Sequence, residues 1–258
     1  LIKNEPSVVC PGHGNPKIDR LFSLVLPVGR PSSGEVINWP QTWDVSHFNY
    51  QPRVERVCSI SANKFSFMAG ELYSLRARSY SEIPEIDVFG MGWDRTVWRS
   101  FLKMAKELQI GLTNPANLSS LKGLSLLLRK PLNYLGATSN KLESMSKYKA
   151  SLVIENSAEF MSEKLHDSIY AGTVPVYVGP SVRHFGIPED LIVQVEGTIP
   201  AIREGISIAL RMNHEDWKNR ARLWLEREGV RDEWDALRVI PKLVLSIEAS
   251  RRAFNPEA

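Results

Sequence analysis

The stretch Ser151–Pro180, SLVIENSAEFMSEKLHDSIYAGTVPVYVGP, decides the fold. Two apolar runs, Ser151–Ile154 and Thr173–Val178, flank a polar segment, and such runs are typical of parallel strands buried on both faces. The segment between them predicts a helix over Ser162–Ala171, because it opens on a serine, which favours the N-cap, and a glycine follows it. The stretch therefore predicts a β-α-β unit, in which Pro175 is unfavourable for a central strand.

Polar residues gather where the first of these strands ends. Asn156 lies at its carboxyl end, and Glu163 and Lys164 open the predicted helix. Ligands of parallel sheets bind outside the carboxyl ends of the strands. A cation in the first helical turn opposes the helix dipole. A phosphate bound there is stabilised by the cation and by the dipole together. Lys164 therefore indicates a phosphate site, with two plainer alternatives: Glu163 and Lys164 as an ordinary solvated pair, and Asn156 as a turn residue.

The rest of the chain alternates between strand and helix patterns, which predicts an α/β fold with a parallel sheet covered on both faces. The expected strands are Ser7–Cys10, Leu21–Val28, Arg56–Ile60, Ile86–Phe89 and Leu191–Val195. The expected helices are Ser66–Ser81, Ala201–Arg227 and Arg231–Arg252, and Phe101–Lys149 is expected to be a variable connector.

Composition argues against several classes of function. The 258 residues carry a net charge of only +3, which does not indicate a nucleic-acid partner. Two cysteines are too few for a cysteine zinc site, and the five histidines show no metal spacing. The longest apolar runs are too short for a membrane-spanning helix, so no transmembrane segment is expected.

The central stretch closely resembles the signature of the family-10 α-1,3/4-fucosyltransferases. The residues Glu155-Asn156-Ser157, Glu163-Lys164 and Gly172-Thr173-Val174-Pro175-Val176 match that signature in order. Upstream, SISANK, LYSLRARSY and IDVFGMGW resemble further segments of the family, and NEPSVVCP resembles its acidic segment. The resemblance implies the GT-B architecture, with two Rossmann-like domains that contain parallel sheets. It also implies transfer of L-fucose from GDP-fucose to a glycan hydroxyl in α-1,3/4 linkage, with inversion.

The resemblance also implies which residues bind the donor. Arg76 and Lys164 would contact the pyrophosphate, and Asn156 would line the donor pocket. Glu163 would contact the ribose or the fucose and favour an oxocarbenium-like state during catalysis. Phe160 is the nearest aromatic residue to a position where the family usually has a tyrosine, so it could keep a stacking contact but no phenol hydrogen bond.

Two assignments carry explicit alternatives. Arg78 would replace Arg76 at the pyrophosphate if the helix register slips by two residues. Glu5 would match the catalytic general base, and Glu35, Asp44 or a residue before the first are its substitutes. The plainer alternative is that Glu5 is a surface residue of a proline-rich turn.

The resemblance divides the chain into a partial acceptor-side domain, residues 1–56, which looks truncated, and a nucleotide-sugar-binding domain, residues 57–258.

Alternatives to the fucosyltransferase function are a transferase that uses another nucleotide sugar and an inactive module that binds a GDP-sugar. Since no Asp-x-Asp triplet occurs, cationic side chains are expected to stabilise the leaving diphosphate, and neither an obligatory metal nor a cofactor is predicted. The compartment stays open between the cytoplasm, the membrane periphery and the Golgi.

Overall fold

The structure, a computed structural model, describes residues 41–64, 66, 69–94 and 129–254, together with positions 2–3, 17, 20, 26–30 and 38. The strand expected at Ser7–Cys10 lies outside the described residues. Of the strand expected at Leu21–Val28, only the end is described. There β2 (Leu26–Pro27) pairs in parallel with β1 (Ile2–Lys3).

The centre of the chain is a six-stranded parallel sheet with the strand order β5-β4-β3-β6-β7-β8. Numbered along the chain, this order is 3-2-1-4-5-6, which is that of two mononucleotide-binding halves joined at a switch point between β3 and β6. The predicted α/β class and parallel sheet are therefore confirmed. The strands are β3 (Val54–Ile60), β4 (Ile86–Phe89), β5 (Asn133–Tyr134), β6 (Tyr148–Ile154), β7 (Val174–Val178) and β8 (Val193–Gln194).

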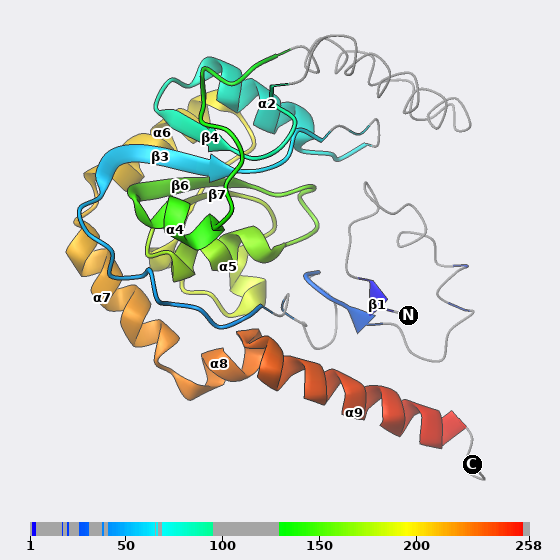
Figure 1. Ribbon diagram of the computed structural model, residues 1–258. Coiled ribbons are helices and arrows are strands. Elements are labelled where there is room, and N and C mark those ends of the chain that lie inside the picture. The colour runs from blue at the N-terminus through cyan, green and yellow to red at the C-terminus, as the bar shows by residue number, and fades with distance from the viewer. Residues whose placement is uncertain are drawn as a thin grey trace.

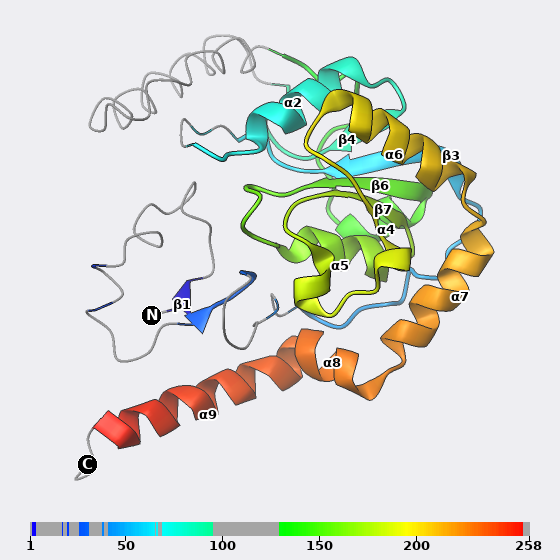
Figure 2. The ribbon, with the colours of Figure 1, turned by 180° about the vertical axis from the view of Figure 1, so that it is seen from behind.

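Helices cover both faces of this sheet. In Figures 1 and 2, α2 (Tyr73–Glu82) and α6 (Ile199–Arg211) lie on one face, and α4 (Lys141–Ser146) and α5 (Glu163–Tyr170) lie on the other. β6 and β7 are buried nearly completely, as their apolar sequences require, whereas β3 is exposed over its first two residues and buried from Val57 to Ser59. The carboxyl ends of β3 and β6 thus meet at one edge, between α2 and α5.

The β-α-β unit predicted from the central stretch is present. Its helix is capped by Ser162, whose side chain accepts from the backbone N–H of Lys164.

Pro175 fits into β7 because no neighbouring strand requires a backbone N–H at this position. The carbonyl of Tyr177 faces β8 and accepts from Val195, so Pro175, two residues earlier, faces the same side. Since β8 starts opposite Val176, the missing N–H of Pro175 interrupts no hydrogen bond between strands.

The helix predicted over Ser66–Ser81 begins later than expected. The pattern over Ser66–Ser81 indicated one helix, but α2 starts at Tyr73. The residues before it contact the segment that follows β6: Glu71 forms an antiparallel bridge with Ser157, and the N–H of Leu72 donates to a backbone carbonyl there. This long-range pairing outweighs the local preference for helix.

The helix predicted over Ala201–Arg227 is two helices, α6 and α7 (His214–Leu225). Met212 adopts an extended conformation, and the side chain of Asn213 accepts from two N–H groups of the next helix. An Asn N-cap followed by acidic residues is a helix start, so this break had a local signal.

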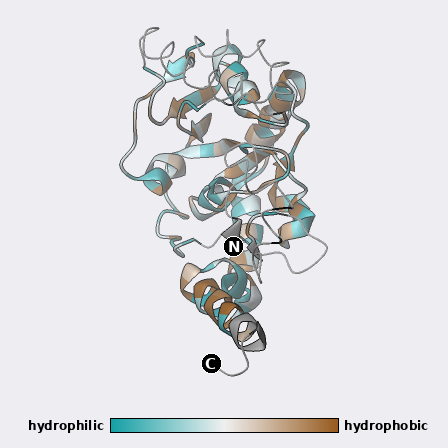
Figure 3. Ribbon diagram, turned by 90° about the vertical axis from the view of Figure 1, so that its right-hand side faces the viewer, coloured by the Kyte–Doolittle hydropathy of each residue, from teal (hydrophilic) through white to brown (hydrophobic). Residues whose placement is uncertain are grey.

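The last predicted helix, Arg231–Arg252, is also divided. It comprises α8 (Glu228–Trp234) and α9 (Ala236–Phe254), separated at Asp235, whose carboxylate accepts from the N–H of Leu237. α9 extends away from the sheet and carries hydrophobic residues, several of them exposed (Figures 1 and 3). Among the helices of the described residues, none has the length and apolar content needed to cross a bilayer.

Other predicted boundaries shift by less. Leu191 belongs to a short 3-10 helix, η4 (Glu189–Leu191), so β8 is shorter than the strand expected over Leu191–Val195. Another 3-10 helix, η3 (Val182–Phe185), follows β7. The end of the expected connector Phe101–Lys149 is structured, since it contains β5 and α4. β3 begins at Val54, and the division of the chain at residue 56 stays a prediction.

Candidate functional site

A pocket of about 450 Å³ opens at the switch point of the sheet. Ser59 and Ser61 line it from the end of β3, Ile154 and Asn156 from the end of β6, and α2, α4 and α5 complete its walls. Nucleotides bind at this position in sheets of this strand order. The location therefore makes this pocket the candidate active site.

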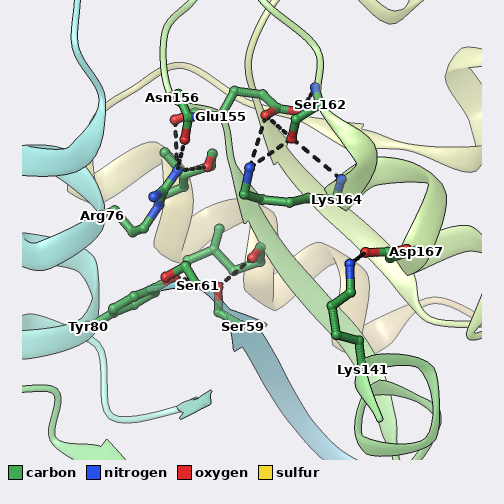
Figure 4. A network of polar contacts seen from close by, with 12 residues as sticks. Ser59, Ser61, Arg76, Tyr80, Lys141, Glu155, Asn156, Ser162, Lys164 and Asp167 are labelled. Atoms are coloured by element: carbon green, nitrogen blue, oxygen red, sulfur yellow. Dashed lines mark hydrogen bonds and ion pairs between the residues drawn. The ribbon is translucent and has the colours of Figure 1, made fainter. Parts of the chain in front are cut away.

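The amino-terminal end of α5 holds a three-residue polar network (Figure 4). The ammonium of Lys164 donates to the hydroxyl oxygen of Ser162 at 2.7 Å, and its nitrogen lies 3.7 Å from Oε2 of Glu155. Ser162 in turn donates to the Glu155 carboxylate from its backbone N–H at 3.0 Å and from its hydroxyl at 2.6 Å. The network fixes Lys164 at the pocket wall while leaving two ammonium protons for a ligand.

Glu155, which the sequence matched to the family signature without giving it a role, is the buried partner of Lys164. It has no exposed surface, and burial raises the pKa of its carboxyl while the nearby ammonium of Lys164 opposes that shift. A Cβ atom on Gly179 would come within 2.8 Å of the Glu155 side chain, so a glycine is needed there for close packing. A carboxylate directly after a buried strand was a usable signal, because such a charge needs a partner. The sequence had instead suggested Glu163 as the neighbour of Lys164.

Of the two arginines considered for the site, the structure places Arg76 at the pocket and Arg78 away from it. Nη2 of Arg76 donates to the backbone carbonyl of Glu155 at 3.0 Å and to Oδ1 of Asn156 at 3.3 Å. Its Nε and Nη1 make no hydrogen bond within the described residues. Arg78 is half exposed and pairs with Glu82, one turn further along α2.

The other predicted donor-binding residues share this pocket. Asn156 and Phe160 line it from the segment between β6 and α5, and Glu163 lines it from the first turn of α5. Phe160 is buried, with 1% of its surface exposed. The structure therefore brings together Arg76, Asn156, Phe160, Glu163 and Lys164, while their roles in donor binding stay predictions.

The pocket also contains a second ion pair, which the sequence did not indicate. Lys141, the first residue of α4, donates to Oδ2 of Asp167 on α5 at 2.6 Å. Burial raises the pKa of the Asp167 carboxyl, and Lys141 opposes this. The side chain of Asn140 caps α4 by accepting from the N–H of Glu143, which was a local signal for this helix inside the expected connector.

Several predicted features cannot be placed at the pocket. Glu5, expected as the general base, and its substitute Glu35 lie outside the described residues. Asp44 is described, in the segment before β3, but does not line this pocket.

His166, on the same helix as Lys164, is buried against Trp234, and burial lowers its pKa to about 3. Within the described residues, no group of three His, Cys, Asp or Glu side chains could hold a metal ion.

Two cations beside a helix N-terminus form an arrangement that suits a diphosphate. The first-turn N–H groups of α5 and the ammonium of Lys164 are anion donors, and Arg76 adds free guanidinium nitrogens. Such preorganised donors can stabilise negative charge that develops on a leaving phosphate.

No protein-family model matches the sequence, and a comparison with curated proteins gives no match either. Solved structures do resemble this one. Anabaena Alr3699/HepE in complex with UDP and glucose has a TM-score of 0.55 at 10% identity, over 96% of this chain and 71% of its own. A Thermobaculum terrenum O-GlcNAc transferase mutant has a TM-score of 0.51 at 14% identity, over 100% of this chain and 46% of its own. An α1,3-fucosyltransferase has a TM-score of 0.37 at 16% identity, over 64% of this chain and 36% of its own.

The first two similarities confirm the predicted fold, the α/β architecture of the GT-B glycosyltransferases. At these identities the similarity concerns the fold alone. The chain also spans only 36% of the length of the fucosyltransferase. Activity, donor and acceptor are therefore matters for proposal.

Proposed function

We propose that the chain contributes the donor-binding half of an inverting glycosyltransferase, which moves L-fucose from GDP-fucose to a glycan hydroxyl in α-1,3/4 linkage. One observation carries the proposal. Arg76 and Lys164, from α2 and α5, line one pocket at the switch point of the sheet, beside a helix N-terminus. A diphosphate is the ligand whose charge and size suit these groups.

The proposed reaction divides its tasks among these residues. Arg76 and Lys164 stabilise the diphosphate as the bond from its oxygen to the anomeric carbon breaks. Glu163, at the pocket wall, favours the positive charge that develops on the fucosyl ring. Glu5 takes the proton of the acceptor hydroxyl, whose oxygen forms the new bond to the anomeric carbon. No metal ion or other cofactor enters this scheme.

A transferase that uses a UDP-sugar is the second candidate. The observation in its favour is that the similar Anabaena structure was solved with UDP and glucose. An inactive module that binds a GDP-sugar is the third. The residue match to the fucosyltransferase signature favours a GDP-sugar over a UDP-sugar, because Glu163 and Lys164 of that match line the pocket.

Donor trials test the proposal. GDP-fucose, GDP-mannose, UDP-glucose and UDP-GlcNAc are each incubated with the protein and a mixture of glycan acceptors, and release of GDP or UDP is measured. Binding of GDP and UDP is measured in parallel by calorimetry. We expect GDP to bind and turnover to require GDP-fucose. Preference for UDP contradicts the proposal, and GDP binding without turnover of any donor supports the inactive module.

A further inference from the structure

The ion pair between Lys141 and Asp167 forms a second polar region of the pocket. Both side chains line the same cavity as Arg76 and Lys164 (Figure 4). The side chain of Asp167 is only 10% exposed, whereas that of Lys141 is 49% exposed. A charged pair held at the wall of a binding pocket is available to a ligand that can hydrogen-bond to both of its members.

Both partners retain hydrogen-bonding capacity. Within the described residues, Lys141 bonds Oδ2 of Asp167, while Oδ1 has no partner. The ammonium of Lys141 has three protons, of which this contact uses one. The pair therefore presents an acceptor and a donor side by side. A ligand edge that carries donors next to an acceptor is complementary to it.

The position of the pair along α5 suggests which part of a nucleotide it contacts. Asp167 follows Lys164 by three residues, so it lies about one turn further along the helix. The pocket continues from Lys164 to Asp167 and Lys141, so it offers a nucleotide whose diphosphate lies at the start of α5 a place for its nucleoside along that helix. Met145, one turn after Lys141 on α4, and Ile60, at the end of β3, add apolar surface to the same pocket, where a flat ring can pack.

Guanine is the base whose edge matches this arrangement. Its N1–H and N2–H groups are adjacent donors, which a carboxylate can accept as a pair, and its O6 is an acceptor for an ammonium. Adenine presents an acceptor, N1, at the centre of this edge, which the carboxylate would repel. Uracil offers a single N–H between two carbonyl oxygens. We propose that Lys141 and Asp167 are specificity-determining residues that recognise the guanine edge of the donor.

This inference rests on the proposed function, in which the donor carries GDP. Inosine diphosphate (IDP) separates the two, since it differs from GDP only by the missing N2 amino group. Calorimetry on the wild-type protein should show IDP binding roughly 10- to 100-fold more weakly than GDP, which is the loss of a hydrogen bond to a charged group. Equal affinity for GDP and IDP overturns the recognition by Asp167 but leaves the GDP-dependent function intact. Preference for UDP overturns both.

Variants assign the effect to this pair. Asp167→Asn should lower GDP affinity and reduce the GDP preference over IDP to within about threefold. Lys141→Met should weaken GDP and IDP alike, since both bases carry O6, and leave the preference in place. The ratio of the two affinities is insensitive to a general loss of structure, because the ligands share ribose and phosphates.

Asp190→Asn is the matched control, since Asp190 pairs with Arg220 at 3.1 Å and does not line the pocket. It should change neither affinity. A GDP preference that persists in Asp167→Asn overturns the assignment. If neither pocket variant folds, equal wild-type affinities for GDP and IDP still overturn the assignment.

Discussion

The ammonium nitrogen of Lys164 lies 3.7 Å from Oε2 of Glu155, and the hydroxyl of Ser162 links the two by hydrogen bonds to both. A fully buried carboxylate at the end of β6 thus has its countercharge on the first turn of α5. The pair joins the strand to the helix at the point where they form the pocket. Lys164 is therefore held in place before any ligand arrives, which reduces the entropy lost on binding.

Replacing Lys164 tests whether its charge contacts the ligand. Lys164→Ala should weaken GDP binding by about 1.5–3 kcal/mol, the contribution of one charge-assisted hydrogen bond. Calorimetry measures this directly. Lys147→Ala is the control, because Lys147 is half exposed, pairs with Glu143 and does not line the pocket. An unchanged affinity in Lys164→Ala removes this residue from the site.

The two arginines of α2 make a sharper comparison. Arg76→Lys should lower GDP affinity by roughly tenfold or more, because lysine lacks the planar fork of the guanidinium. Arg78→Ala should leave it within about twofold, since neighbours two apart on a helix point in different directions. Arg76 also bonds the backbone after β6, so thermal unfolding is recorded for each variant. Loss of binding in Arg78→Ala but not in Arg76→Ala reverses the assignment.

The predicted independence from metal has a direct test. GDP binding, and turnover with GDP-fucose, should persist in excess chelator, because Arg76, Lys164 and the start of α5 supply the positive charge. Calorimetry and a donor-turnover assay are repeated with and without chelator. Loss of function that manganese alone restores would show that a metal ion holds the diphosphate.

Glu5 is tested by separating binding from turnover. Glu5→Gln should leave GDP affinity unchanged and lower turnover by about 10²-fold or more, which is the usual contribution of general-base catalysis. Glu5→Asp is the conservative control, because it keeps the carboxylate. Full turnover in Glu5→Gln would transfer the role to another carboxylate, with Glu35 and Asp44 the next variants to make.

The β-α-β unit could be predicted because its signals are local. The apolar runs of β6 and β7, the Ser162 cap and the glycine after α5 all lie within one continuous stretch. The late start of α2 had no local signal, because it depends on pairing between Glu71 and Ser157, which lie far apart in the chain. Long-range contacts of this kind override helix propensity.

The candidate site also contains residues with a local sequence signal and residues that depend on long-range contacts. Lys164 and Asn156 could be found because strand ends and helix starts are visible in the sequence. The pair Lys141–Asp167 could not, because it requires that α4 and α5 pack side by side on one face of the sheet. Its two residues belong to different segments of the chain.

The buried Glu155 gives a prediction about stability and pH. Burial raises the pKa of its carboxyl above the ordinary value of 4.5, so the folded protein binds this proton more tightly than the unfolded chain. The resulting stabilisation is fully present below pH 4.5 and is lost as the pH rises through the raised pKa. Glu155→Gln removes this dependence. The free energy of unfolding of the variant, relative to wild type, should therefore increase from about pH 4 to pH 8.

Denaturant unfolding at a series of pH values measures this difference. Asp167, whose pKa is also raised, is present in both proteins and cancels to first order. Glu189→Gln is the control with the opposite sign, because the guanidinium of Arg183 lowers the pKa of Glu189 and makes its contribution disappear as the pH falls. The free energy of unfolding of Glu155→Gln relative to wild type could instead stay constant or decrease as the pH rises. That result would mean that the charge of Lys164 outweighs burial in its effect on the pKa of the Glu155 carboxyl. The Glu155 carboxyl would then be ionised throughout this range, as one member of a permanent ion pair.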